Sequence, residues 1–232
     1  MLERDLGRFA FAAAQSALSP LGAGAQQLRN SLDAVADRDF ALDYLYAATV
    51  LFTHLSRIGE ELVLWTTSEF GFARLPESAA TGSSMMPQKL NPDVAELTRG
   101  KAGTAIGRLT GLLAVVKGLP LSYDRDLQED KRPVFDARRD TALALAALSV
   151  LMAGIELDRD RLAEACADPQ LLATDAAEAL VHEGVPFREA HECIASQVRD
   201  GTFEAPSTPG ARPTPGPGGV REQVAAARAR LG

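Results

Sequence analysis

The stretch FALDYLYAATVLFTHLSRIGEELVLWTT, residues 40–67, decides the fold class of this protein. Its apolar side chains recur at alternating steps of four and three residues, so they form one continuous stripe along a helix. The stripe consists of Tyr44, Ala48, Leu51, Leu55, Ile58, Leu62 and Trp65. At about 1.5 Å per residue, such a helix spans roughly 40 Å, well beyond the mean for globular proteins. This length predicts a long helix bundle rather than a compact globin-like fold.

Two further long helices are predicted downstream. Asn91 is a good N-cap and Pro92 suits a first helical turn, and the helix that they start ends near Gly118. Another helix is expected from about 132 to 155. Four glycines inside the first of these helices cost propensity and predict that neighbouring helices approach it closely: Gly100, Gly103, Gly107 and Gly111. Because no segment alternates convincingly with a period of two, we expect an all-α fold.

We expect four parts along the chain. Residues 1–157 form the central long-helix bundle, which carries a loop at 81–92. Residues 158–203 form a small helical C-terminal domain, broken by EGVP at 183–186. The segment EAPSTPGARPTPGPGG, residues 204–219, has no apolar periodicity and predicts a flexible linker, and residues 220–232 form a terminal helix.

Composition and charge exclude several classes of protein. A net charge of −7 argues against a protein that coats nucleic acid or an anionic membrane. The longest uncharged run, residues 141–155, is shorter than the roughly 20 residues that a membrane span needs. The two cysteines have no metal-ligand spacing, and the first residues do not resemble a signal peptide. We therefore expect a cytoplasmic protein with neither nucleic-acid nor membrane partners.

The loop TGSSMMPQKLNP, residues 81–92, carries the first candidate site. Two serines, Lys89 and the positive end of the following helix would converge there, which favours anion binding. The same positive surroundings would make a serine hydroxyl easier to deprotonate. Met85 and Met86 would help to close the loop over a site and exclude water. The plain alternative is a simple connection between two helices.

A second polar segment is KGLPLSYDRDLQEDK, residues 117–131. Tyr123, Gln128 and Lys131 supply a hydroxyl, an amide and a cation, which together suit a small molecule rich in carboxylates. The same residues could instead be the solvated start of a helix, and the sequence by itself leaves both interpretations open.

These two segments together resemble the fumarase/aspartase superfamily, and PQK at 87–89 points to its argininosuccinate lyase family. Three more segments are similar to that family in the same order: NSLDAVADRDF (30–40), THLSRIGEEL (53–62) and LLATDAAEALVHEGVPFREAHE (171–192). The resemblance implies β-elimination of argininosuccinate to L-arginine and fumarate, without a metal or organic cofactor. It also implies a homotetramer in which each active site is assembled from three subunits.

The resemblance assigns a role to eight residues. It implies that Ser83 is the catalytic base, that Lys89 stabilises the dianionic intermediate and that Glu96 orients a histidine. The implied substrate-binding residues are Ser84, Asn91, Tyr123, Gln128 and Lys131.

The histidine that the family uses as an acid has no counterpart among the three histidines here. His54 is expected to pack within the bundle, and His182 and His191 to lie at surface or packing positions. We therefore expect a truncated chain, similar to the C-terminal half of the family, whose activity in isolation is weak or absent. The alternatives are another fumarate-releasing lyase of the superfamily and a non-catalytic oligomerising remnant.

Overall fold

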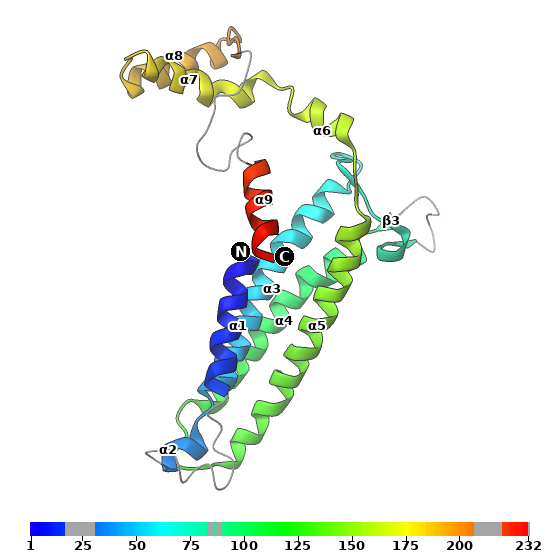
Figure 1. The fold of residues 1–232 in the computed structure, drawn as a ribbon, viewed down its shortest axis with the longest axis vertical. Coiled ribbons are helices and arrows are strands. Elements are labelled where there is room, and N and C mark those ends of the chain that lie inside the picture. Colours follow the sequence, from blue (N-terminus) through cyan, green and yellow to red (C-terminus); the bar gives the residue numbers. More distant parts are fainter. Residues whose placement is uncertain (17–30, 83–85, 87–89, 207–219, 232) are drawn as a thin grey trace. The chain divides into compact units, whose positions relative to one another are not determined.

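The computed structural model describes residues 1–16, 31–82, 86, 90–206 and 220–231 (Figure 1). The chain consists of two compact units, Met1–Arg159 and Asp160–Gly232.

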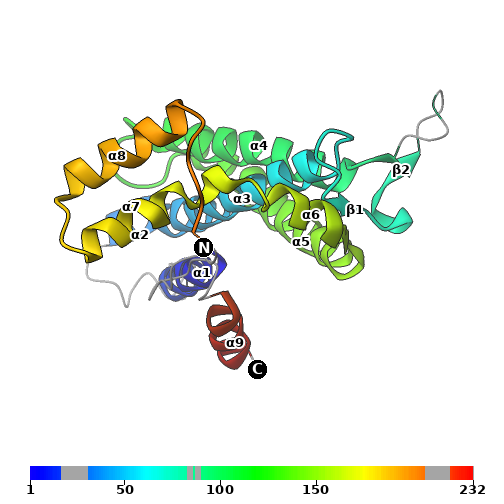
Figure 2. The ribbon, with the colours of Figure 1, turned by 90° about the horizontal axis from the view of Figure 1, so that it is seen from above.

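Four long helices form the first unit and lie side by side (Figures 1 and 2). They are α1 (Leu2–Ser16), α3 (Asp39–Trp65), α4 (Asp93–Val116) and α5 (Lys131–Gly154), and the short helix α2 (Ser31–Ala36) precedes α3. The predicted all-α, long-helix fold is therefore confirmed. Helix α1 was not predicted, and it packs on α3 with an edge-to-face contact between Phe9 and Tyr44 whose ring centroids lie 5.8 Å apart.

Helix α3 is the central helix of this bundle. Ala48, Leu51, Leu55 and Leu62 of its predicted stripe are buried, and the other members are partly buried. Leu45 and Phe52 lie off the stripe and are also buried, each about 1% exposed. Because α1, α4 and α5 all contact α3, more than one face of this helix is removed from water.

Helices α3 and α4 approach each other closely at Gly59 of α3. A Cβ atom added there would lie 2.6 Å from the carbonyl oxygen of Ala95 in α4, which is closer than real Cβ contacts. The four glycines of α4 are exposed, and a Cβ atom on any of them would meet nothing within 4 Å in the described part of the chain. The expectation that a neighbouring helix of this chain approaches these four glycines is therefore wrong.

Asn91 does not cap α4, contrary to the sequence prediction. It lies in β3 (Leu90–Asn91), which pairs antiparallel with β2 (Thr81–Gly82) in the register Thr81 to Asn91. The cap position belongs to Pro92, with no side-chain hydrogen bond, and the Pro92 carbonyl accepts from the N–H of Glu96 at 2.9 Å. The backbone of Asn91 is used in the strand pairing, so Asn91 is not the cap residue. The helix starts at Asp93, two residues later.

The other elements of this unit are short. Strands β1 (Ala73–Arg74) and β4 (Glu156–Leu157) pair antiparallel, and η2 (Glu77–Ala79) and η3 (Arg125–Asp130) are 3-10 helices. The fully buried Leu127 of η3, at 1% exposed, anchors the segment that leads into α5.

Helices also make up the second unit. They are α6 (Arg159–Ala165), which begins at the boundary, η4 (Pro169–Leu172), α7 (Ala173–His182), α8 (Phe187–Arg199) and α9 (Val220–Leu231). Between α7 and α8, Gly184 has a positive φ of 96°, and its N–H and that of Val185 bond to carbonyls of α7. In the described ranges, no helix is both long and apolar enough to cross a membrane.

Candidate active site

The first candidate cluster surrounds the start of α4. The β2–β3 pairing holds Gly82 next to Leu90, and α4 begins at Asp93, three residues after Leu90. Asn91 is half-buried there, and Glu96 is exposed. Ser83, Ser84 and Lys89 lie outside the described residues, so their roles stay predictions.

Near Glu96, the first turns of α4 also carry an ion pair with α3. Arg99 Nη1 lies 2.7 Å from the Glu60 carboxylate. This hydrogen bond and the charge of Glu60 raise the pKa of the Arg99 guanidinium above its ordinary value, and the charge of Glu96 adds to the effect. The region therefore holds carboxylates and a cation at the surface, but the described residues bring no histidine into hydrogen-bond contact with Glu96.

The three histidines occupy the positions expected of them. His54 Nδ1 lies 2.7 Å from Asp5 Oδ2, which joins α3 to α1, and Asp5 is buried and also bonds to Arg8 at 3.0 Å. His182 and His191 are exposed on α7 and α8. His54 is thus a satisfied residue of the bundle, as predicted.

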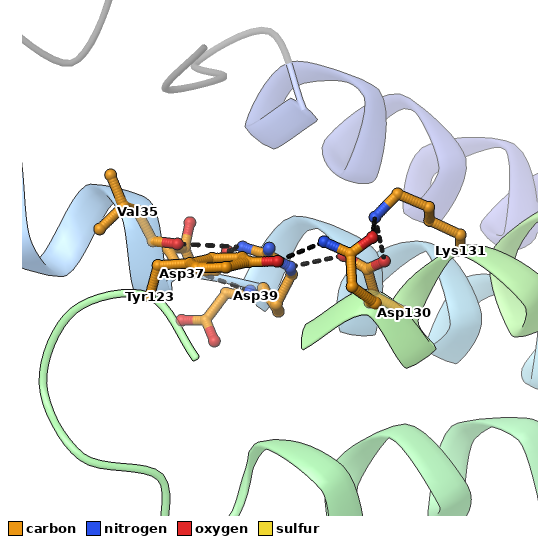
Figure 3. A network of polar contacts seen from close by, with 8 residues as sticks. Val35, Asp37, Asp39, Tyr123, Asp130 and Lys131 are labelled. Carbon is orange, nitrogen blue, oxygen red and sulfur yellow. Dashed lines mark hydrogen bonds and ion pairs between the residues drawn. The ribbon is translucent and has the colours of Figure 1, made fainter. Parts of the chain in front are cut away.

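Tyr123, Gln128 and Lys131 form the second candidate cluster, and hydrogen bonds connect all three (Figure 3). The Gln128 amide donates to the Tyr123 hydroxyl, and Lys131 Nζ donates to Gln128 Oε1 at 3.0 Å. All three residues are exposed, and the Lys131 side chain is 55% exposed. The structure therefore brings together a hydroxyl, an amide and a cation that a ligand can reach.

Sequence reasoning missed two further members of this network, Arg38 and Asp130. Arg38 Nε donates to Asp130 Oδ2 at 2.5 Å, and Lys131 Nζ lies 3.4 Å from Asp130 Oδ1. Arg38 and Asp130 are both largely buried, and their side chains are 13% and 12% exposed. The signal for Asp130 was its position next to Lys131. Nothing local pointed to Arg38, which is 92 residues away in sequence.

Acidic side chains surround the start of α3 next to Arg38. The Asp37 carboxylate accepts from the backbone N–H of Asp39 at 2.7 Å. Burial raises the pKa of the Asp39 carboxyl, and the negative charges of Asp37, Asp43 and Asp33 raise it further. Arg38 therefore lies among several carboxylates, and its guanidinium donates to one of them, that of Asp130.

The two clusters lie at opposite ends of α4. Figure 1 shows β3 beside the start of α4 and the start of α5 at the far end of α4. Asn91 and Glu96 are at the start of α4, whereas Tyr123 lies seven residues after its last residue and α5 begins with Lys131. A helix of 24 residues is about 36 Å long. One copy of the chain thus keeps the described members of the predicted site in two separate groups. Among the described residues, no group of three or more His, Cys, Asp and Glu could hold a metal ion.

Family models and curated proteins match this chain along most of its length. The model described as Lyase matches residues 9–107, and the model described as Argininosuccinate lyase C-terminal matches residues 170–205. The argininosuccinate lyase of Frankia casuarinae is 56% identical over 198 residues, which cover 83% of this chain and 43% of that protein. The argininosuccinate lyase of Anaeromyxobacter dehalogenans is 51% identical over 214 residues, covering 84% of this chain and 46% of that protein.

Solved structures of lyases share the fold. An EDDS lyase variant with bound fumarate matches with a TM-score of 0.71 at 26% identity, over 85% of this chain and 44% of that one. A fumarate lyase:delta crystallin from Brucella melitensis matches in fold with a TM-score of 0.68 at 22% identity, over 87% and 49%. The chain spans a little under half the length of the curated relatives that it matches. Over that part of their length, the chain is similar in sequence to argininosuccinate lyases, and its residues 170–205 match the C-terminal model of that family.

Proposed function

We propose that this chain supplies residues to an active site that cleaves argininosuccinate into L-arginine and fumarate. The observation that carries the proposal is the exposed, hydrogen-bonded set of Tyr123, Gln128 and Lys131, in a chain about half identical to curated argininosuccinate lyases. A hydroxyl, an amide and a cation in one patch suit a substrate with several carboxylates. A cytoplasmic location remains part of the proposal.

The proposed reaction is a β-elimination. Ser83 removes a proton from the carbon next to a substrate carboxylate, and the electron pair moves into that carboxylate to give an aci-carboxylate. Lys89 faces this developing charge, as a preorganised cation does in an oxyanion hole. The carbon–nitrogen bond then breaks, and the guanidino nitrogen keeps the electron pair and takes up a proton from an acid. Asn91 and Ser84 bind substrate, and Glu96 orients the histidine that serves as that acid.

The distance between the two clusters supports an assembled site. A small molecule cannot reach both ends of a helix about 36 Å long. We propose that the cluster around Asn91 in one copy and the cluster around Lys131 in another copy meet in a homotetramer. Exposed apolar side chains on α4 and α5 support association of copies through these helices: Leu97, Ile106, Leu113, Phe135 and Leu143.

Association through α4 predicts that a charge on this helix separates the copies. Ile106 is 51% exposed, and Ile106→Lys would place an ammonium group between packed helices. We expect analytical ultracentrifugation to show a smaller species for Ile106→Lys than for the unaltered chain at the same concentration. Leu171→Lys is the control, since Leu171 is 60% exposed in the second unit. Equal masses for all three proteins would contradict association through α4.

The reaction itself is tested by following fumarate through its ultraviolet absorbance. We expect little or no turnover of argininosuccinate by the chain alone. We expect turnover when the chain is mixed with a full-length family member in which the serine equivalent to Ser83 is alanine. Ser83→Ala in this chain should then lower the restored rate by at least about 100-fold. Equal rates with and without Ser83 would contradict its role as the base.

The choice of substrate is a separate question, because a related fumarate-releasing lyase is the alternative. The likeness to an EDDS lyase variant, at 26% identity, is a reason to test this alternative. Argininosuccinate, adenylosuccinate and malate should be compared in the same mixed assembly. Turnover of adenylosuccinate or malate in preference to argininosuccinate would move the chain to another branch of the superfamily.

A further inference from the structure

We propose that Arg38 is a positioning residue that holds the Asp130 carboxylate away from Lys131 and so leaves the Lys131 charge free for a substrate carboxylate. The inference rests on the proposed function in one respect, namely that Lys131 binds a carboxylate. Neither Arg38 nor Asp130 has a role in the reaction proposed above.

The distances show which cation holds Asp130. Charge-assisted N–H···O contacts are ordinarily about 2.7–2.9 Å long. Arg38 Nε lies 2.5 Å from one oxygen of Asp130, whereas Lys131 Nζ lies 3.4 Å from the other. Asp130 is therefore bound to Arg38, and its contact with Lys131 is long and weak (Figure 3).

The position of Arg38 does not depend on a ligand. Its Nη1 donates to the backbone carbonyl of Asp37 at 2.6 Å and lies 3.4 Å from that of Val35. The side chain is 13% exposed, and Asp130 sits at the start of α5 behind the buried Leu127. A planar guanidinium held by several acceptors at once is preorganised, and a lysine could not reproduce this fork.

The charges of the three side chains explain why this arrangement matters. Arg38 and Asp130 pair in a largely buried contact, so the three side chains together carry one net positive charge, and the exposed Lys131 is held to Asp130 only by its longer contact. Its other hydrogen bond goes to Gln128 Oε1, which is uncharged. Without Arg38, the buried Asp130 carboxylate would have Lys131 as its nearest cation. An ion pair between these neighbours would then compete with any carboxylate that approaches from solvent.

The test uses succinate as a probe of carboxylate binding to the intact chain. The side-chain NMR signal of Lys131, assigned by its loss in Lys131→Met, reports binding as succinate is added. We expect Arg38→Gln to weaken binding on the order of tenfold. The double substitution Arg38→Gln with Asp130→Asn should restore it to within about twofold, because the competing carboxylate is gone. A merely structural role for Arg38 predicts no such recovery.

A second measurement does not depend on any ligand. Acetylation by acetic anhydride compares the reactivity of Lys131 with that of Lys117, which is also exposed. Lys131 should react several-fold more slowly in Arg38→Gln and recover in the double variant. If this pattern holds while succinate does not bind the unaltered chain, the proposed function fails and the role of Arg38 stands. Unchanged Lys131 reactivity in Arg38→Gln, or no recovery in the double variant, would overturn the inference.

Discussion

Replacing Asp140 with alanine is expected to lower the free energy of unfolding by about 3 kcal/mol. The Asp140 side chain on α5 is only 2% exposed, and it accepts from Lys101 at 2.9 Å and from Arg108 at 2.7 Å, both on α4. Its removal leaves the Arg108 guanidinium, itself 16% exposed, without the buried carboxylate that joins these helices. Urea unfolding followed by far-ultraviolet circular dichroism measures the change.

Asp136→Ala is the matched control on the same helix. Asp136 pairs with Arg139 at 3.0 Å, but the Arg139 side chain is 61% exposed, so water competes for this ion pair. An exposed pair of this kind contributes at most about 1 kcal/mol. Equal losses of stability in Asp136→Ala and Asp140→Ala would show that burial does not strengthen the α4–α5 contact.

The contribution of Asp140 should also depend on pH. Burial by itself raises the pKa of this carboxyl, but the hydrogen bonds and charges of Lys101 and Arg108 outweigh that effect and bring the pKa below its ordinary value of 3.8. Since the pKa is lower in the folded than in the unfolded chain, the stabilisation is present above 3.8 and is lost as the pH falls through the lowered value. The stability difference between the unaltered chain and Asp140→Asn should therefore shrink below that pH.

Gly59→Ala is expected to destabilise the bundle by about 2–3 kcal/mol, although alanine ordinarily stabilises a helix. The added Cβ atom would lie 2.6 Å from the Ala95 carbonyl oxygen, and that oxygen belongs to the backbone of α4. A backbone atom cannot rotate away as a side chain can, so α3 and α4 have to separate. The separation would loosen the core around Phe52 and Leu55, which α3 contributes.

The control for this prediction is Gly7→Ala in the interior of α1. A Cβ atom at Gly7 would meet nothing within 4 Å, so the helix propensity of alanine should raise the free energy of unfolding by up to about 1 kcal/mol. The two substitutions are chemically identical, yet we expect opposite signs in urea unfolding. A gain in stability for Gly59→Ala would contradict the close approach of α3 and α4.

Local sequence was sufficient for the helices and for part of the site. The spacing of apolar residues at 40–67 predicts α3 because a helix repeats every 3.6 residues whatever it packs against. Tyr123, Gln128 and Lys131 lie within nine residues of one another, so they could be grouped before any contact was known. Asn91 was misplaced because its side chain suits a cap, whereas its backbone pairs with Thr81 ten residues earlier.

Tertiary structure decided what joins segments that are distant in sequence. The Arg38–Asp130 contact spans 92 residues, and the Gly59–Ala95 approach exists only because α3 and α4 lie side by side. The same packing places the start of α4 and the Lys131 cluster at opposite ends of one helix. By itself the sequence determined which faces are apolar and which residue types could carry the chemistry. Which of them meet depends on helix lengths and on which apolar faces pack together, and no local pattern encodes that choice.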